Sequence, residues 1–183
     1  MNKIVSFYNH DDNKDIAKIV LAVALTVCTI NSRKITINSK ALFKYFTQNK
    51  EDNEFYNVKK YFTISNFDKV TSHNAMFDYT FLISSSVVEC DILICVYDLK
   101  KSNFAEIKSS LITCLKKKMK TYILLLNYEK KYIKVYSEVA KTYDHVQLFS
   151  FSNEDITKIN IEKLIEEKLP LSNWMLKLIK KIT

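Results

Sequence analysis

The sequence contains no glycine and a single proline in its 183 residues. Glycine is the residue that enters left-handed backbone conformations without cost, so a glycine-rich loop wrapped around a phosphate chain is excluded. Asparagine and aspartate adopt such conformations at a modest cost. We therefore expect the turns to use the asparagines that lie between the predicted elements: Asn13, Asn31, Asn38, Asn103, Asn127 and Asn153.

Closely spaced cysteines and long apolar runs are missing too. No C-x-x-C pair occurs, and the four cysteines lie in apolar surroundings, which predicts buried reduced thiols rather than a zinc site or disulfides: Cys28, Cys90, Cys95 and Cys114. No apolar run approaches the ~20 residues that cross a bilayer, and the N-terminus has no signal-peptide pattern. We expect a cytoplasmic protein.

The chain is rich in apolar residues and in positive charge. Its hydrophobic content of 48% is enough for the core of a single domain. Its formal net charge of +8 favours an anionic partner, either nucleic acid or an acidic membrane surface. A coding bias toward Lys, Asn and Ile gives the same charge without any binding, so both interpretations stay open.

Short apolar strands alternate with segments of helical periodicity. Strands are predicted at 4–8, 34–37, 77–86, 92–97, 121–127 and 146–149, and helices from 16 onward and at 40–48, 104–118, 132–140 and 155–169. Segment 49–74 reads as one or two strands or as an irregular aromatic segment. This alternation predicts an α/β fold with a mostly parallel central sheet and helices on both faces.

Two helix starts carry capping signals. Ser39 precedes the helix predicted at 40–48 and is a suitable N-cap residue. Asn103, followed three residues later by Glu106, has the spacing of a capping box.

The opening stretch, MNKIVSFYNHDDNKDIAKIVLAVALTVCTI, resembles the ParA/MinD family of partition ATPases. IVSFYNH matches the family's first strand, and IVLAVALTV matches its first helix. FDYTFLISSS, further along, resembles the strand Y-D-Y-I-I-I-D-T-P-P. The resemblance implies a P-loop-NTPase-like domain over 1–170, followed by a C-terminal amphipathic helix over 171–183.

The residues that hold nucleotide in this family are replaced here. The resemblance places Asp11 at the signature lysine and Ile16 at the phosphate-binding lysine. Asn38 stands where one aspartate would be, and Ile83, followed by Ser84, stands where another would be. It therefore implies a degenerate nucleotide site with no ATPase activity and no bound cofactor. The replaced loop positions are Asp11, Asp12, Asn13, Asp15, Ile16 and Ala17.

The acidic loop has two other interpretations. Asp11, Asp12 and Asp15 are residues of the type that binds a divalent cation, and His10 is of the type that serves as a general base. Carboxylates also stabilise a helix N-terminus without any ligand. We adopt this last interpretation and predict no metal and no catalytic residue.

Two further segments are candidate binding surfaces. A lysine cluster with tyrosines among it is a candidate DNA contact: Lys116, Lys117, Lys118, Lys120, Lys130, Lys131 and Lys134. The C-terminal helix has an apolar face that either binds an anionic membrane or a partner, or docks on its own domain, which we favour: Trp174, Met175, Leu178, Ile179 and Ile182.

Together these features predict a catalytically inactive ParA-like protein that acts in plasmid or chromosome partition or its regulation. It would act through protein–protein and non-specific DNA contacts, as a homodimer or as a heterodimer with an active ParA-like paralogue. The alternatives are a MinD-like membrane-associated positioning factor and a small enzyme with an unrecognised pocket.

Overall fold

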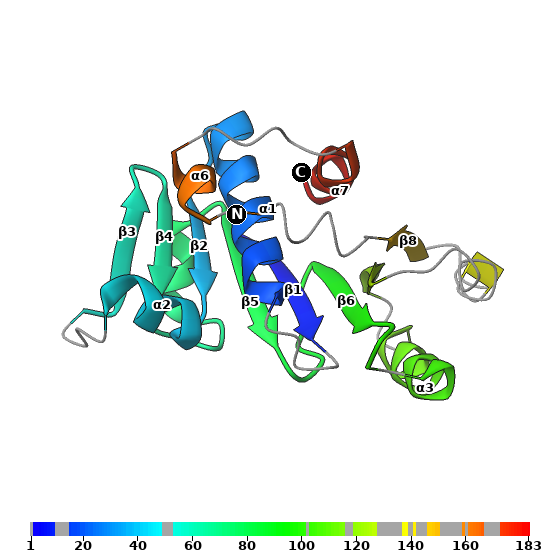
Figure 1. Cartoon of the computed structure of the whole chain (residues 1–183). Coiled ribbons are helices and arrows are strands. Elements are labelled where there is room, and N and C mark those ends of the chain that lie inside the picture. The colour runs from blue at the N-terminus through cyan, green and yellow to red at the C-terminus, as the bar shows by residue number, and fades with distance from the viewer. Residues whose placement is uncertain are drawn as a thin grey trace.

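The computed structural model describes residues 2–9, 15–48, 53–101, 103–115, 119–127, 137–138, 141, 146–150, 159, 161–166 and 173–183. Eight strands form one sheet in the order β3-β4-β2-β5-β1-β6-β7-β8 (Figure 1). All neighbouring strands are parallel except β3 and β4. The predicted mostly parallel α/β sheet is confirmed.

The strands begin and end within two residues of their predicted positions. Segment 49–74, for which the sequence left several possibilities open, contains the antiparallel strands β3 and β4. The strands are β1 Lys3–Asn9, β2 Ile35–Asn38, β3 Phe55–Lys59, β4 Phe62–Ser65, β5 Tyr79–Ser84, β6 Ile92–Asp98, β7 Lys120–Leu126 and β8 Val146–Ser150.

The described helices are α1 Ile16–Asn31, α2 Lys40–Thr47, α3 Phe104–Leu115, α6 Ile161–Ile165, α7 Asn173–Ile182 and the 3-10 helix η1 Ser72–Met76. The helix predicted at 132–140 lies outside the described residues apart from 137–138. Most of the helix predicted at 155–169 also lies outside them, and α6 is its described part.

Both predicted helix caps are confirmed. The Ser39 hydroxyl accepts a hydrogen bond from the backbone N–H of Leu42 at 3.3 Å. Asn103 and Glu106 exchange side-chain-to-backbone hydrogen bonds of 3.0 and 3.1 Å. These bonds satisfy N–H groups that a helix start leaves without intrahelical partners.

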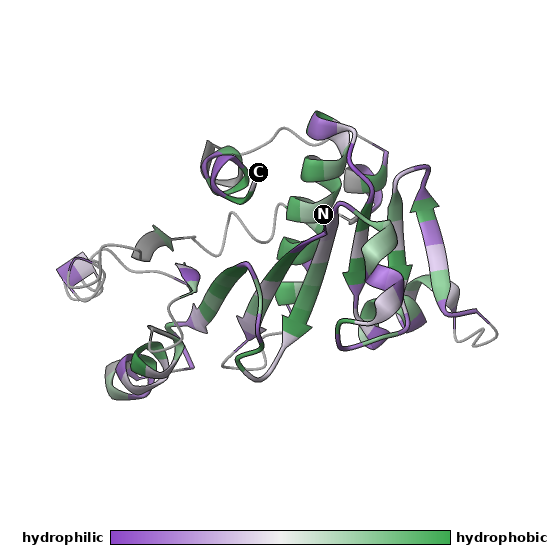
Figure 2. Ribbon diagram, turned by 180° about the vertical axis from the view of Figure 1, so that it is seen from behind, coloured by the Kyte–Doolittle hydropathy of each residue, from purple (hydrophilic) through white to green (hydrophobic). Residues whose placement is uncertain are grey.

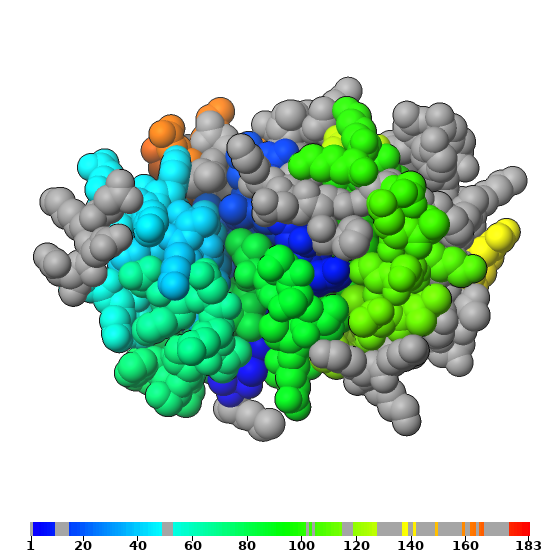
Figure 3. Space-filling view, turned by 90° about the horizontal axis from the view of Figure 1, so that it is seen from below, coloured from blue at the N-terminus to red at the C-terminus, as the bar shows by residue number. Residues whose placement is uncertain are grey.

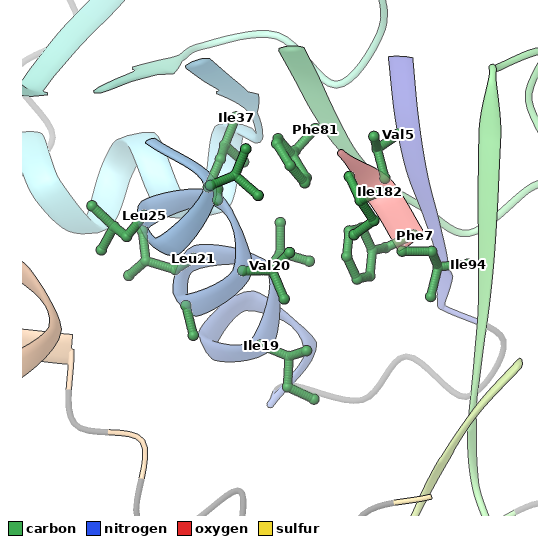
Figure 4. Packing of buried hydrophobic residues seen from close by; sticks show 14 of the residues in the cluster. Val5, Phe7, Ile19, Val20, Leu21, Leu25, Ile37, Phe81, Ile94 and Ile182 are labelled. Carbon is green, nitrogen blue, oxygen red and sulfur yellow. The ribbon is translucent and has the colours of Figure 1, made fainter. Parts of the chain in front are cut away.

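Two apolar cores lie on opposite faces of the sheet. The larger core joins α1, α2 and α7 to the odd-numbered side chains of β1, β2 and β5, and Figure 4 shows Ile182 of α7 beside Val5 and Phe7 of β1. The smaller core joins α3 to β6 and β7. The green, apolar stretches of α1 and of the central strands in Figure 2 belong mainly to the larger core. The prediction of helices on both faces is therefore correct.

The prediction that asparagines serve the turns is mostly wrong. Among the described residues, positive φ angles occur at Ser32 (48°), Gln48 (50°) and Asn127 (55°). Asn38 is the last residue of β2 and keeps the extended strand conformation. Asn31 is the last residue of α1, so the left-handed position after that helix falls one residue later, at Ser32. A helix end demands this conformation from whichever residue follows it. Asn13 and Asn153 lie outside the described residues.

Candidate functional site

The carboxyl ends of β1, β5 and β6 lie together at one end of the sheet, which is where ligands bind in open α/β folds. This carboxyl-terminal end of the sheet faces the viewer in Figure 3, where blue N-terminal residues lie between teal and green ones. The residues that the sequence singled out here come from the start of α1 and from the ends of β2 and β5.

The described residues at the N-cap and the first two positions of α1 offer no side chain that could bind a phosphate group. Asp15 occupies the N-cap position without a side-chain capping bond, and its carboxylate instead pairs with Lys18 at 3.1 Å. This pair joins Asp15 to the first turn of its own helix. Asp11, Asp12 and Asn13 lie outside the described residues.

Ile16 and Ala17 carry no group that could bind phosphate or a metal ion. The Ile16 side chain is 3% exposed and belongs to the larger core, together with Ile19 and Val20 of the same helix. Ala17 is partly buried against this core. The position that the resemblance assigns to the phosphate-binding lysine is thus filled by a core residue.

Asn38, at the end of β2, is fully buried in a polar network. Its amide N–H₂ group donates to the backbone carbonyl of Lys69 at 2.7 Å and to Asn74 at 3.1 Å. Its carbonyl oxygen accepts from the Ser65 hydroxyl at 2.7 Å. These bonds join β2 to β4 and to the segment that carries η1. Asn38 therefore has a structural role in which its polar atoms are satisfied within the protein.

The residues at the end of β5 also form hydrogen bonds with one another, within a turn. The Ser84 hydroxyl donates to the backbone carbonyl of Ser86 at 2.7 Å and accepts from the Ser86 N–H at 3.1 Å. Ile83 packs against the larger core. The two positions that could have supplied the family's carboxylate hold a turn-forming hydroxyl and an apolar side chain.

Sequence reasoning missed a polar pair at the ends of β6 and β7. Asp98 is 4% exposed, and its carboxylate accepts from the Asn127 side-chain amide at 2.7 Å and from the Lys100 N–H at 3.0 Å. Asn127 Oδ1 is buried without a hydrogen-bond partner among the described residues. A polar residue directly after each of two apolar strands was the available signal, because such residues meet at one edge of a parallel sheet.

A groove of about 390 Å³ lies between α3 and the β5–β6 connection. Its lining is neutral except for one carboxylate, and consists of Tyr8, Val87, Glu106, Ser109, Ser110 and Thr113. The hydroxyl groups of Tyr97 and Ser110 are 3.0 Å apart, and burial raises the pKa of the Tyr97 phenol, which stays protonated. Without a cationic residue in its lining, the groove is poorly suited to phosphate.

The remaining candidate residues divide into described and undescribed ones. Among the described residues, no cluster of three metal-ligating side chains occurs, and no helix is long and apolar enough to cross a membrane. Lys120 is exposed, and its ammonium group donates to the backbone carbonyl of Lys181 at 3.0 Å. The other candidate DNA-binding residues lie outside the described part: Lys116, Lys117, Lys118, Lys130, Lys131 and Lys134.

The C-terminal helix is docked on its own domain. Leu178, Ile179 and Ile182 are at most 3% exposed and belong to the larger core. Their apolar surface is therefore not available to a membrane while α7 is docked. The side chains of Trp174 and Met175 lie outside the described residues.

Comparison with solved structures finds proteins with the same arrangement of strands and helices. A plasmid partition protein from Borrelia burgdorferi bound to AMPPNP aligns with a TM-score of 0.60 and 11% identity, over 100% of this chain and 98% of that one. MinD from Pyrococcus horikoshii with Mg-ADP aligns with a TM-score of 0.66 and 11% identity, over 100% and 96%. The chain has the ParA/MinD fold.

This ParA/MinD fold also aligns with the MinC:MinD complex from Aquifex aeolicus, at a TM-score of 0.66 and 8% identity, over 98% of this chain and 95% of that one. No protein-family model and no curated protein matches the sequence. The likeness at these identities is one of fold, and the ParA/MinD resemblance of the opening residues is confirmed at that level.

Proposed function

We propose that the chain is a catalytically inactive ParA-like protein that acts in plasmid or chromosome partition or its regulation. The observation that carries the proposal is the position of Ile16, which is buried in the larger core where the ParA/MinD resemblance expects the phosphate-binding lysine. Two solved structures that share this fold are those of a plasmid partition protein and of MinD.

The other positions of the expected site support the same proposal. Asn38 stands at one aspartate position and is held in buried hydrogen bonds, and Ile83 stands at another and packs against the larger core. Mg²⁺ and the γ-phosphate require a lysine, a hydroxyl and a carboxylate acting together. With all three replaced, the protein would use its ParA/MinD surface for binding without hydrolysing ATP.

The proposed nucleic-acid partner is DNA, which the protein would bind without sequence specificity. The net charge of +8 supports it, as do the exposed lysines Lys120, Lys177, Lys180 and Lys181. The lysine cluster around Lys117 is the proposed contact. Lysine contacts to phosphates release counterions, so log affinity should fall linearly with log salt concentration.

Fluorescence anisotropy with a labelled duplex tests this role. We expect salt-dependent binding that ATP leaves unchanged, and a shallower salt slope when Lys116, Lys117 and Lys118 are changed to glutamate. Charge reversal of three exposed lysines outside the cluster, Lys44, Lys60 and Lys69, gives the same change in net charge and is the control. Absence of binding at low salt, or an equal loss in the control, would contradict a DNA contact through this cluster.

The proposed protein partner is a second copy of this chain or an active ParA-like paralogue, bound through the face that carries the altered loop. Negative charge at Asp11 and Asp12 is free to meet lysines of another subunit when no phosphate is present. Sedimentation at micromolar concentration should detect the complex, and Asp11→Lys with Asp12→Lys should dissociate it. A monomer that the double substitution leaves unchanged would point to the paralogue, which a pull-down then tests.

Membrane positioning of the MinD type is the weaker alternative. Its apolar anchor would be α7, whose Leu178, Ile179 and Ile182 are buried in the domain. Recruitment to vesicles containing anionic lipid, abolished by Trp174→Glu, would favour this function over DNA partition.

A further inference from the structure

Strand β3 forms one outer edge of the sheet. It bonds to β4 on one side, and no strand among the described residues lies on its other side, as the leftmost strand of Figure 1 shows. An outer strand presents a row of backbone N–H and C=O groups that another chain can pair with.

The register of β3 identifies the outward-facing backbone groups. The carbonyl of Glu54 accepts a hydrogen bond from the N–H of Asn66 at 2.8 Å, and Phe55 pairs with Ser65. Hydrogen-bonded and non-hydrogen-bonded pairs alternate along an antiparallel ladder. Tyr56 therefore directs its backbone groups toward β4, and Phe55 and Asn57 direct theirs toward the free edge.

We propose that β3 pairs antiparallel with β3 of a second copy of this chain, with Phe55 opposite Asn57 of the second copy. The two-fold symmetry repeats this pair, and each pair exchanges both of its backbone hydrogen bonds. Tyr56 then lies opposite Tyr56 of the second copy at the intervening non-hydrogen-bonded position. This surface is distinct from the altered loop, so the inference is independent of the proposed function.

Exposed aromatic side chains sit where this pairing would bury them. Tyr56 is 37% exposed and stacks on Phe46 of α2 with ring centroids 5.9 Å apart. Tyr45 is 63% exposed and contacts Phe46 edge-on at 5.3 Å. Side chains at a non-hydrogen-bonded position approach most closely across a ladder. The aromatic row Tyr45, Phe46 and Tyr56 would thus continue from one copy into the other.

Charge selects the antiparallel orientation. The β3 segment begins with the exposed Glu54 and ends with Lys59 and the exposed Lys60. Antiparallel pairing places the acidic end of each strand beside the basic end of the other, and like charges directly opposite are destabilising. A parallel pairing would place like charges together at both ends.

The contact is short and reversible. A β-bulge lies between Asn57 and Lys59, where the ladder with β4 shifts register. A bulge bends the strand and ends regular pairing, which is a common way in which proteins limit edge-to-edge association. The pairing is therefore confined to residues 55–57 and should populate a discrete dimer rather than a growing sheet.

Cysteine cross-linking at adjacent positions tests the register. Tyr56→Cys places two thiols opposite each other at the non-hydrogen-bonded position, whereas Asn57→Cys places its thiol opposite Phe55 on the other face. Under mild oxidation we expect several-fold more disulfide-linked dimer from Y56C than from N57C or the unmodified chain. Equal yields from Y56C and N57C, or no dimer from either, would overturn the proposal.

Sedimentation equilibrium with two matched variants tests the backbone bonds. Asn57→Pro removes the outward N–H, and Asn57→Thr keeps it. Both variants lose the 3.0 Å bond that the Asn57 side chain accepts from Thr63. In the Asp11→Lys, Asp12→Lys background, which removes the proposed contact through the altered loop, we expect N57T to dimerise like its parent and N57P to dimerise at least tenfold more weakly. Equal dimerisation of N57P and N57T, or a monomer at all concentrations, would refute the pairing, and if N57P does not fold the Y56C and N57C comparison decides.

Discussion

The ammonium group of Lys120 on β7 donates a hydrogen bond of 3.0 Å to the backbone carbonyl of Lys181 in the last turn of α7. The Tyr122 hydroxyl donates to the same carbonyl at 3.2 Å, and Lys3 of β1 donates to the next one, at Ile182. Carbonyls at a helix C-terminus have no intrahelical partner and attract cations. Two strands thus anchor the end of the C-terminal helix, and burial together with the charge of Lys120 lowers the pKa of Lys3.

Docking of α7 predicts a large loss of stability when its buried face is truncated. Leu178 is fully buried, so Leu178→Ala should lower the free energy of unfolding by about 2–5 kcal/mol through lost burial and a residual cavity. Lys177→Ala, at the adjacent exposed position, should change it by less than about 0.5 kcal/mol. Urea denaturation measures both. A neutral L178A variant would mean that α7 is detached in solution.

The buried network around Asn38 predicts a second stability effect. Asn38→Ala leaves the Ser65 hydroxyl and the Lys69 carbonyl without their partner, at a cost of about 1–3 kcal/mol for each unsatisfied buried group. Asn53→Ala, at an exposed position before β3, is the control and should be nearly neutral. Thermal unfolding followed by circular dichroism distinguishes the two. Equal melting temperatures would show that Asn38 is not a structural residue.

The burial of Ile16 predicts a third stability effect, caused by a charged residue at this position. Ile16→Lys brings an ammonium group into the larger core, where a charge without a partner costs several kcal/mol or loses its proton. We expect I16K to be strongly destabilised or unfolded, and Ala17→Lys, at the partly buried neighbouring position, to be less so. Denaturant midpoints compare the two variants. A stable I16K protein would indicate that side chain 16 faces an open, solvated site instead.

Alkaline pH should weaken the fold through the smaller core. The hydrogen bond to Cys114, with burial, raises the pKa of the Cys95 thiol above its ordinary value of 9.0. The unfolded chain then loses this proton first as pH rises, so stability is complete below about pH 9 and falls above it. Denaturant midpoints from pH 7 to 10.5 measure the decline. Cys95→Val should make it shallower, and an identical slope in the variant would rule out the thiol as a cause.

The sequence was sufficient for the order of elements because burial patterns are local. Apolar runs such as 92–97 and the helical spacing that begins at Ile16 each reflect one segment facing one core. The antiparallel β3 was ambiguous, since Tyr56 and Asn57 are exposed and Phe55 is only partly buried, which leaves a weak alternation. Strand order depends on contacts between residues far apart in sequence and was not predicted from the sequence.

The sequence was enough to predict that the candidate site has no phosphate-binding side chains. It was less informative about where the replacing residues lie in the structure. That Ile16 cannot bind phosphate follows from its side chain, but its place in the core does not follow from spacing alone. The Asp98–Asn127 pair was missed because its residues are 29 positions apart and meet through the register of β6 with β7. The left-handed residues Ser32 and Gln48 were missed because helix ends, and not residue type, determined them.

Isothermal titration calorimetry with ATP and Mg²⁺ tests most directly the claim that the nucleotide site is lost. Ile16 and Ile83 pack in or against the larger core and Asn38 is held in buried hydrogen bonds, so these positions supply no lysine or carboxylate for the γ-phosphate or the metal ion. We predict no heat of binding at millimolar nucleotide beyond that of dilution. Saturable binding with micromolar affinity would contradict the account.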